Sequence, residues 1–189
     1  MAQDKRTKLL TAAVEAFGAK GFHGTTTRDI ALAAGMSPAA IYVHHRSKEE
    51  LLYVISREGH RTLLDAITTA VEGTQTPANR LSALVRTWVT TVAANQAVSR
   101  VVKDEIDALS PDHKEEILTL RRDLEHVARR VIEEGIDLGE FASSAPHLTA
   151  RAIVSLGMDV ARWYRPDGTW PVDQIAEHYA GIALRLVRP

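Results

Sequence analysis

Residues 25–51 decide the fold of this chain, and they read TTTRDIALAAGMSPAAIYVHHRSKEEL. Two short helical patterns flank Gly35, whose freedom of backbone conformation suits a tight turn. Thr25 and Thr26 stand at the start of the first pattern as candidate N-caps, because their hydroxyl oxygens accept hydrogen bonds from helix N–H groups. The first pattern ends at Ala34. This spacing predicts two helices joined by a glycine turn, as in a helix-turn-helix.

The second helix of the pair is predicted to begin at Ser37, another good N-cap. Pro38 follows at the first helical position, where a missing N–H costs nothing. A third helix begins at Ser47, and Glu50 completes the S-x-x-E pattern of a capping box. This long helix is predicted to end near Gly73. The arrangement is the one that places the second helix of the pair in the major groove of DNA.

The rest of the chain also follows a helical period, and no segment shows the alternation of a strand. Gly21 ends the first helix, and Thr74 to Pro77 form a linker. We predict an all-α protein with a three-helix head at 1–52, a larger helical bundle at 53–189 and about nine helices in total. The remaining helices are predicted at 5–20, 78–95, 97–109, 111–139, 146–165 and 171–187.

Composition and motifs exclude several classes of protein. The 189 residues contain no cysteine, which rules out disulfides, thiol catalysis and cysteine-bound metal. No apolar run reaches the roughly 18 residues that span a bilayer. The N-terminal apolar residues recur at helical spacing without a signal-peptide cleavage site, so we expect a cytoplasmic protein. The sequence has no nucleophile elbow, phosphate-binding loop or HExxH pattern, so we expect no enzyme activity, no cofactor and no metal.

Charge is distributed unevenly along the chain, although the formal net charge is only −1. Residues 1–60 contain eight basic and six acidic side chains, whereas residues 61–189 contain fifteen and eighteen. The head is therefore slightly positive and the body slightly negative. This polarity is mild, but its sign suits a DNA-binding head on a nearly neutral body.

The head offers one apolar side for packing and one polar side for contact with a partner. A helix-turn-helix needs both, because one helix braces the other while outward side chains contact phosphates or bases. The predicted packing residues are Ile30, Ala31, Ala34, Met36 and Ile41. The predicted outward residues are Thr27, Arg28, Ser37, Tyr42, His44 and Lys48. Taken singly, Arg28 and Lys48 are ordinary solvated charges, and only the combined pattern favours DNA binding.

An extended motif runs through this head: Phe17-x3-Gly21-Phe22-x2-Thr25-Thr26-x3-Ile30-Ala31-x2-Ala34-Gly35-Met36-Ser37-x3-Ile41-Tyr42-x-His44-x2-Ser47-Lys48-x2-Leu51. The motif resembles the DNA-binding domain of the TetR family of transcriptional regulators. The resemblance implies an operator-binding domain at 1–52 and a ligand-binding and dimerisation domain at 53–189. It implies phosphate contacts from Tyr42, His44 and Lys48, and groove contacts from Thr27, Arg28, Pro38, Ala39 and Val43.

Two positions depart from the family pattern. His45 stands where the family usually has a packed aromatic residue, and Arg46 stands where proline is common. His45 therefore either packs inward as a neutral ring or turns outward with Arg46 toward phosphate. Adjacent histidines on a helix point in different directions, so His44 and His45 do not predict a metal site. Since the outward residues of the recognition helix are small or apolar, only Arg28 is suited to a bidentate pair with guanine.

The resemblance implies a homodimer, and recognition geometry favours one too. A single recognition helix reads only about three to five base pairs, and a two-fold pair doubles that length. Gly157 and Gly181 are expected to allow close approach of helices. The candidate interface lies on the last two helices, at Leu148, Ile153, Leu156, Val160, Ile175, Tyr179, Ile182 and Leu186. An internal core stripe made of the same residues is the alternative.

The effector is suggested by residues 159–168, which read DVARWYRPDG. This segment resembles the end of the penultimate helix in actinobacterial TetR-type repressors of steroid and fatty-acid catabolism, which tend to sense acyl-CoA thioesters. Such a ligand needs cations for its phosphates and an apolar tunnel for its acyl chain. Trp88, Val92 and Leu124 are the tunnel candidates, and Arg100, Arg129 and Arg162 are the cation candidates. Pairing of these arginines with nearby carboxylates is the alternative.

These observations predict a homodimeric repressor that a small, apolar or acyl-CoA effector releases from a palindromic operator. The Ser47–Gly73 helix is expected to couple the two domains, because it joins them. Two other functions remain open at this stage. One is a transcriptional activator with the same fold, and the other is a helical interaction protein without specific DNA binding.

Overall fold

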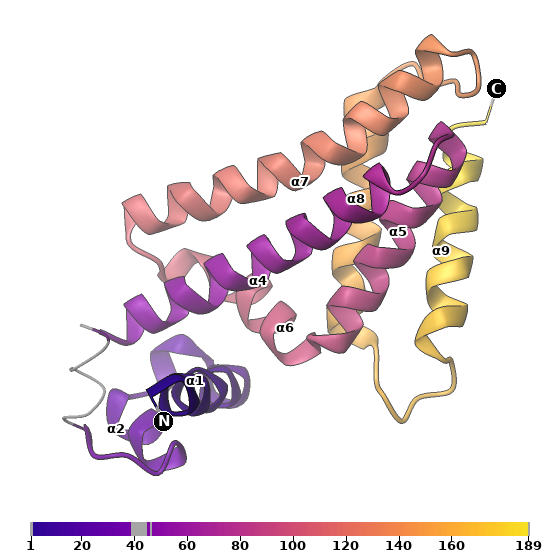
Figure 1. Cartoon of the computed structure of the whole chain (residues 1–189). Helices are drawn as coiled ribbons and strands as arrows, with labels where there is room; N and C mark the ends of the chain where they lie inside the picture. Colours follow the sequence, from indigo (N-terminus) through magenta and orange to yellow (C-terminus); the bar gives the residue numbers. More distant parts are fainter. Residues whose placement is uncertain (1, 39–44, 46, 189) are drawn as a thin grey trace. The chain divides into compact units, whose positions relative to one another are not determined.

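A computed structural model describes residues 2–38, 45 and 47–188, and the described part is almost entirely helical (Figure 1). It contains eight α-helices and one 3-10 turn, and none of the described residues lies in a strand. The elements are α1 Ala2–Gly24, α2 Thr27–Ala33, α4 Lys48–Glu72, α5 Pro77–Ala94, α6 Gln96–Asp104, η1 Ile106–Ala108, α7 Pro111–Asp137, α8 Pro146–Trp163 and α9 Val172–Leu186. The predicted all-α class is confirmed, whereas most of the predicted recognition helix lies outside the described residues.

The chain forms two compact units, and each draws on two separate segments. The first contains the described residues of 1–59 and 97–118, and the second contains 60–96 and the described residues of 119–189. Two helices, α4 and α7, contribute to both units.

The first unit is built around an apolar face of α1. Leu9, Ala13 and Phe17 on this face are at most 2% exposed, as are Ile30 on α2 and Leu51 on α4. Residues 97–118 join this packing. Val101 lies 3.9 Å from the position of a Cβ on Gly18 of α1, and Val98 lies 3.3 Å from the corresponding position on Gly59 of α4. The unit therefore extends well beyond the sequence segment of the predicted head.

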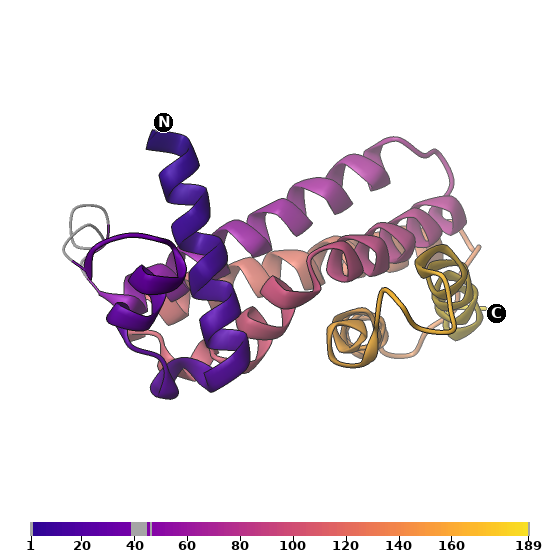
Figure 2. The same cartoon turned by 90° about the horizontal axis from the view of Figure 1, so that it is seen from below.

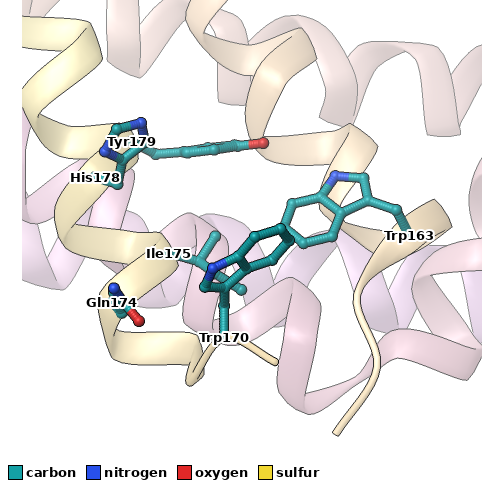
Figure 3. A pocket seen from close by; sticks show the side chains of 6 residues that line it. All are labelled: Trp163, Trp170, Gln174, Ile175, His178 and Tyr179. Atoms are coloured by element: carbon teal, nitrogen blue, oxygen red, sulfur yellow. The ribbon is translucent and has the colours of Figure 1, made fainter. Parts of the chain in front are cut away.

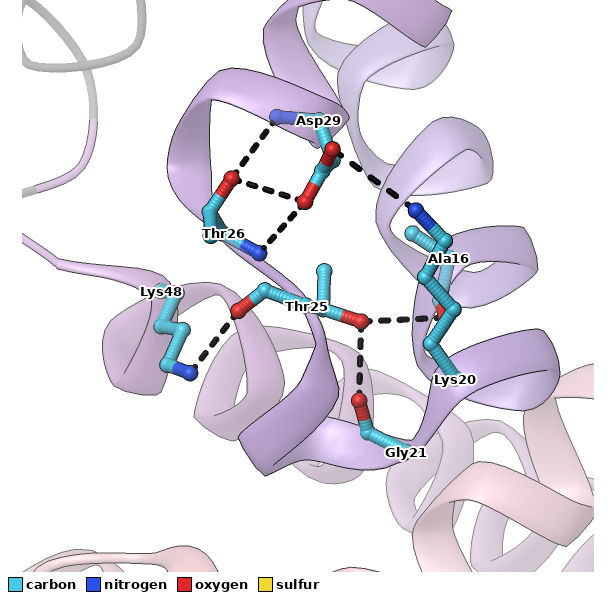
Figure 4. A network of polar contacts seen from close by, with 7 residues as sticks. All are labelled: Ala16, Lys20, Gly21, Thr25, Thr26, Asp29 and Lys48. Carbon is cyan, nitrogen blue, oxygen red and sulfur yellow. Dashed lines mark hydrogen bonds and ion pairs between the residues drawn. The ribbon is translucent and has the colours of Figure 1, made fainter.

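Helix ends in the first unit follow the predicted caps with one refinement. The helical geometry of α1 breaks at Gly21, whose φ of 69° lies in the left-handed region that favours glycine. Thr26 is the N-cap of α2, whereas Thr25 is buried and its hydroxyl donates to the carbonyl oxygens of Ala16 and Gly21 at 3.0 and 2.8 Å (Figure 4). Ser47 Oγ accepts a hydrogen bond from the Glu50 N–H at 3.1 Å, which is the N-cap bond of the predicted capping box.

One predicted helix is divided in the structure. The pattern at 97–109 predicts a continuous helix, but α6 ends at Asp104 and η1 follows at Ile106–Ala108. Tight 3-10 turns are common where a helix ends and the chain changes direction. Here the chain has to reverse before α7 begins at Pro111, and Leu109 is buried in the connection.

The second unit packs α5 against α8 and α9, which run beside it (Figure 1). Its core includes Trp88, Val89, Ile132 and Val160, each at most 2% exposed. The connection 164–171 joins α8 to α9 at one end of this unit (Figure 2). Gly157 of α8 passes directly over the Trp88 ring, where an added Cβ would lie only 2.8 Å from Cδ1. The close approach predicted at Gly157 is therefore made within the chain, between α8 and α5.

Candidate DNA interface and effector pocket

The described DNA-contact candidates lie on the surface of the first unit. Arg28, Ser37 and Pro38 are exposed, and Thr27 is half-buried at the first position of α2. Lys48 is described and half-buried, and four further candidates fall outside the described residues: Ala39, Tyr42, Val43 and His44. Arg28, Ser37 and Pro38 are therefore accessible to a partner. The individual DNA contacts stay predictions.

A capping box fixes the N-terminus of α2 and with it the position of Arg28. Asp29 Oδ2 accepts hydrogen bonds from the Thr26 N–H at 2.9 Å and from its hydroxyl at 2.7 Å, and Thr26 Oγ accepts from the Asp29 N–H at 3.1 Å (Figure 4). These bonds from Thr26, together with the charge of Lys20 3.6 Å away, hold the pKa of the Asp29 carboxyl below its usual value. The carboxylate stays ionised and keeps α2 capped.

Lys48 makes contacts that the sequence did not predict. Its Nζ donates hydrogen bonds to the carbonyl oxygens of Phe22 and Thr25, each at 2.8 Å, and lies 4.3 Å from the centroid of the Phe22 ring. A lysine in this position ties the first turn of α4 to the connection between α1 and α2 (Figure 4). The sequence showed only that Lys48 follows a helix cap. Its two hydrogen-bond partners lie 26 and 23 residues earlier in the chain, so a local pattern could not reveal them.

His45 is buried, with only 6% of its surface exposed. Of the two orientations that the sequence left open, the structure has the inward one. A histidine here therefore fills the position at which the family pattern usually places an aromatic ring.

The tunnel candidates Trp88, Val92 and Leu124 are each 2% exposed, in the core of the second unit. No described residue accepts a hydrogen bond from the buried Trp88 Nε1. Leaving such a donor unsatisfied costs about 1–3 kcal/mol, which an acceptor on a ligand or a water would recover.

Two of the three cation candidates pair with carboxylates on their own helix, and the third belongs to the first unit. Arg162 donates to the Asp159 carboxylate at 2.9 and 3.0 Å, and Arg129 Nε lies 3.5 Å from Glu133 Oε1. These are the short-range pairs that the sequence offered as the alternative. Arg100 is exposed and belongs to the first unit. Within the second unit, Arg129 and Arg162 therefore each pair with a carboxylate on their own helix.

A pocket of about 530 Å³ opens beside the connection 164–171 in the second unit. That volume lies in the range of small-molecule sites, and most of the side chains around it are aromatic. Trp163 and Tyr179 pack with ring centroids 6.5 Å apart. Burial and the negative charge of Asp159 raise the pKa of the Tyr179 hydroxyl, so the hydroxyl is a neutral donor. The lining residues are Trp163, Trp170, Gln174, Ile175, His178 and Tyr179 (Figure 3).

Sequence reasoning placed the effector near Trp88 and did not predict this pocket. Trp163 and Trp170 flank the turn Arg165-Pro166-Asp167-Gly168, and this pair of tryptophans was the available signal. The pocket has an apolar floor, while Gln174 and His178 are exposed polar residues of its lining. Such a site suits a flat apolar ring system that carries few hydrogen-bonding groups.

Comparison with known sequences identifies the family. The family description "Tetracyclin repressor-like, C-terminal domain" matches residues 74–187, and "Bacterial regulatory proteins, tetR family" matches residues 9–54. The chain belongs to the TetR family. Among curated relatives, the HTH-type transcriptional repressor KstR2 of Rhodococcus jostii is 31% identical over 182 residues, which are 95% of this chain and 89% of that protein.

Solved TetR-family structures share the fold over nearly the whole chain. A tetR-family regulatory protein from Rhodococcus RHA1 is 42% identical, with 97% of each chain covered and a TM-score of 0.93. The ketosteroid transcriptional regulator KstR2 of Mycobacterium tuberculosis is 28% identical, with 97% of this chain and 95% of that chain covered and a TM-score of 0.89.

In this TetR-family chain, the dimer candidates divide between the core and the surface. Ile153, Val160 and Ile175 are at most 6% exposed and pack inside the single chain, which is the alternative that the sequence left open. Leu148, Leu156 and Leu186 are 59%, 39% and 46% exposed. Tyr179 and Ile182 are half-buried. Within the described residues, no helix is both long and apolar enough to cross a membrane.

Proposed function

We propose that this TetR-family chain is a homodimeric repressor that leaves its operator when a small molecule binds the second unit. The observation that carries the proposal is the match of residues 9–54 to the family's DNA-binding domain. The capped α2 with exposed Arg28 supports it. The curated relative KstR2 is a repressor, which favours repression over activation. A regulator of this kind acts on DNA in the cytoplasm and needs no catalytic group.

The proposed DNA surface combines exposed described residues with residues assigned by the family pattern. Arg28 is the proposed partner of guanine, and Pro38, Ala39 and Val43 are proposed to contact thymine methyl groups or groove walls. The proposed phosphate contacts come from Tyr42, His44 and Lys48. Thr27 and Ser37 are proposed as further DNA contacts beside them. For Lys48 the proposal is limited by its two carbonyl partners, since two of its three N–H donors already point into the head.

We assign the effector to the pocket beside Trp163 and Trp170. The relative from Mycobacterium tuberculosis is named as a ketosteroid regulator, and a flat ring system of that kind fits an apolar, aromatic-lined site. An acyl-CoA thioester is the alternative that the 159–168 segment suggests. Trp88, Val92 and Leu124 remain proposed lining residues for the acyl chain, and the unsatisfied Trp88 Nε1 supports a polar atom near them.

We place the dimer interface on the exposed apolar side chains of α8 and α9. Leu148 and Leu156 lie on α8 and Leu186 on α9, and exposed leucines at these spacings form a surface that a second copy would bury. Because the pocket lies between the same two helices, a bound effector would change the surface that the partner contacts. This gives a direct route from ligand to the spacing of the two heads.

The operator test uses fluorescence anisotropy with DNA from the region upstream of the chain's own gene. Specific binding at about physiological salt, with half-sites about one helical turn apart, is expected of a repressor dimer. Binding no tighter than to random DNA would favour the helical interaction protein instead. Pro38→Ala should change the preference among operator sequences, and an equal loss on all sequences would contradict its assignment to the groove.

A further inference from the structure

Glu49 connects two helices of the first unit that are far apart in the sequence. Its Oε1 accepts a hydrogen bond from the Ser110 N–H at 2.9 Å and lies 2.8 Å from His113 Nδ1. Ser110 immediately precedes α7, so the Glu49 carboxylate sits at the positive end of the α7 dipole. The side chains are partly shielded, with 22% of Glu49 and 33% of His113 exposed. The first turn of α4 thus caps the start of α7.

A second layer of contacts lies one turn further along both helices. The Tyr53 ring stacks on the His113 ring, with centroids 3.7 Å apart and planes inclined by only 6°. The Tyr53 hydroxyl donates to Glu116 and accepts from Arg57 at 3.3 Å. Burial and the hydrogen bond to Glu116 raise the pKa of the Tyr53 hydroxyl, which therefore remains a donor. We call Glu49, Tyr53, His113 and Glu116 the α4–α7 clasp.

The clasp lies where two connecting helices enter the first unit. Both α4 and α7 are unbroken, and each continues from the first unit into the second, with the change at residues 59–60 and 118–119 (Figure 1). The residue before Glu49 is Lys48, which binds the carbonyls of the α1–α2 connection. The first turn of α4 is therefore bonded to the end of α1 and the α1–α2 connection on one side, and to the start of α7 on the other.

Within the second unit the same two helices are linked again. Arg121 Nε of α7 donates to His60 Nε2 of α4 at 3.3 Å, and His60 is only 4% exposed. The pair α4 and α7 is thus connected by side chains in both units. A displacement of one helix has to break these contacts or carry the other helix with it.

We propose that Glu49, Tyr53 and His113 are positioning residues that make α7 a second coupling helix of the DNA-binding unit. The inference rests on the proposed repressor function, because its consequence is a change in operator affinity. Movement of α7 would reach Lys48 and the α1–α2 connection through the clasp, in addition to any movement that α4 transmits alone. Without the clasp, α4 would lose the bonds from Glu49 and the Tyr53 ring to the start of α7.

The test uses near-isosteric variants of the full chain, so that packing is kept while single contacts are lost. Glu49→Gln keeps an oxygen for the Ser110 N–H but removes the charge beside His113. His113→Phe keeps the stack on Tyr53 but removes Nδ1. Glu177→Gln removes one partner of the exposed Arg86 pair between α5 and α9, and it serves as the control.

Two measurements are made on the single variants, the Glu49/His113 double variant and the control. Amide hydrogen exchange is expected to quicken by about three- to tenfold in α2 and the first turns of α4, with no change in α5. Operator affinity is expected to fall by a similar factor, and the double variant should be no weaker than the weaker single variant. The control should change neither quantity.

Three results would contradict the proposed role of the clasp. They are unchanged amide exchange in α2, an equal increase of the exchange rate in both units, and fully additive effects of the two single substitutions on operator affinity. The exchange measurement needs no DNA. If the wild-type chain shows no specific operator, the repressor function fails while the exchange data still decide whether the clasp holds the head.

Discussion

Replacing Lys48 by methionine separates two roles that one ammonium group can have. The substitution keeps the length and apolar stem of the side chain but removes both hydrogen bonds to the carbonyls of Phe22 and Thr25. A hydrogen bond from a charged donor contributes about 1.5–3 kcal/mol. Since Lys48 is half-buried, water replaces part of this, and we expect a loss of about 1–3 kcal/mol in total. For a chain of this size the melting temperature should fall by roughly 2–10 °C.

Operator binding at several salt concentrations measures the second role. If the Lys48 ammonium also neutralises a phosphate, Lys48→Met should reduce the slope of log affinity against log salt by about 0.9. If the ammonium only ties α4 to the α1–α2 connection, affinity should fall while the slope stays the same. Lys48→Arg keeps the charge but cannot reproduce the compact three-donor geometry, so it should keep the slope and lose stability.

Arg130→Met is the matched control, because it removes one exposed cation from the second unit. It should leave both the melting temperature and the salt slope unchanged. A Lys48→Met protein that melts like the wild type would refute the reasoning from the two carbonyl bonds. The salt slope would then be the only evidence for any role of Lys48.

Three further outcomes follow from other sites. Gly157→Ala should destabilise the second unit by about 1–3 kcal/mol, because its Cβ would lie 2.8 Å from the Trp88 ring; an unchanged urea midpoint would contradict this. Asp29→Asn should be less stable than the wild type above pH 3.8, where the wild-type carboxylate is charged and bonded to Thr26. The difference in stability should shrink as acid protonates the carboxylate. A difference that does not depend on pH would contradict the role of the Asp29 charge. Trp170→Leu should weaken binding of the ketosteroid probe androstenedione by about tenfold, measured by fluorescence titration, and leave operator affinity intact; equal affinity for the probe would remove Trp170 from the site.

Local features of the sequence predicted the helices well. Caps such as Thr26 and Ser47 act over three residues, and Pro111 and Pro146 mark helix starts, so their signals are complete within one turn. Trp88, which was predicted to line an effector tunnel, is a buried core residue of the second unit.

Contacts between distant segments could not be predicted from local patterns. The close approach at Gly157 was expected between subunits, yet the ring that it meets belongs to α5 of the same chain. Lys48 carries the same local signature whether its ammonium faces phosphate or protein carbonyls. The pocket at Trp170 depends on how α8 and α9 place two tryptophans around one turn. Each of these needs the three-dimensional course of the chain, which periodicity does not contain.

The discontinuous first unit has a consequence for protein engineering. Val98 and Val101 pack against α4 and α1, so residues 97–118 supply part of the interior of the DNA-binding unit. A fragment cut after Gly59 would expose that interior to water. Transplanting this operator specificity onto a different sensor therefore requires three junctions, one after Gly59 and one at each end of residues 97–118. In a hybrid with a single junction after Gly59, residues of the other protein would replace Val98 and Val101. The buried side of α1 would then pack against side chains that do not match it.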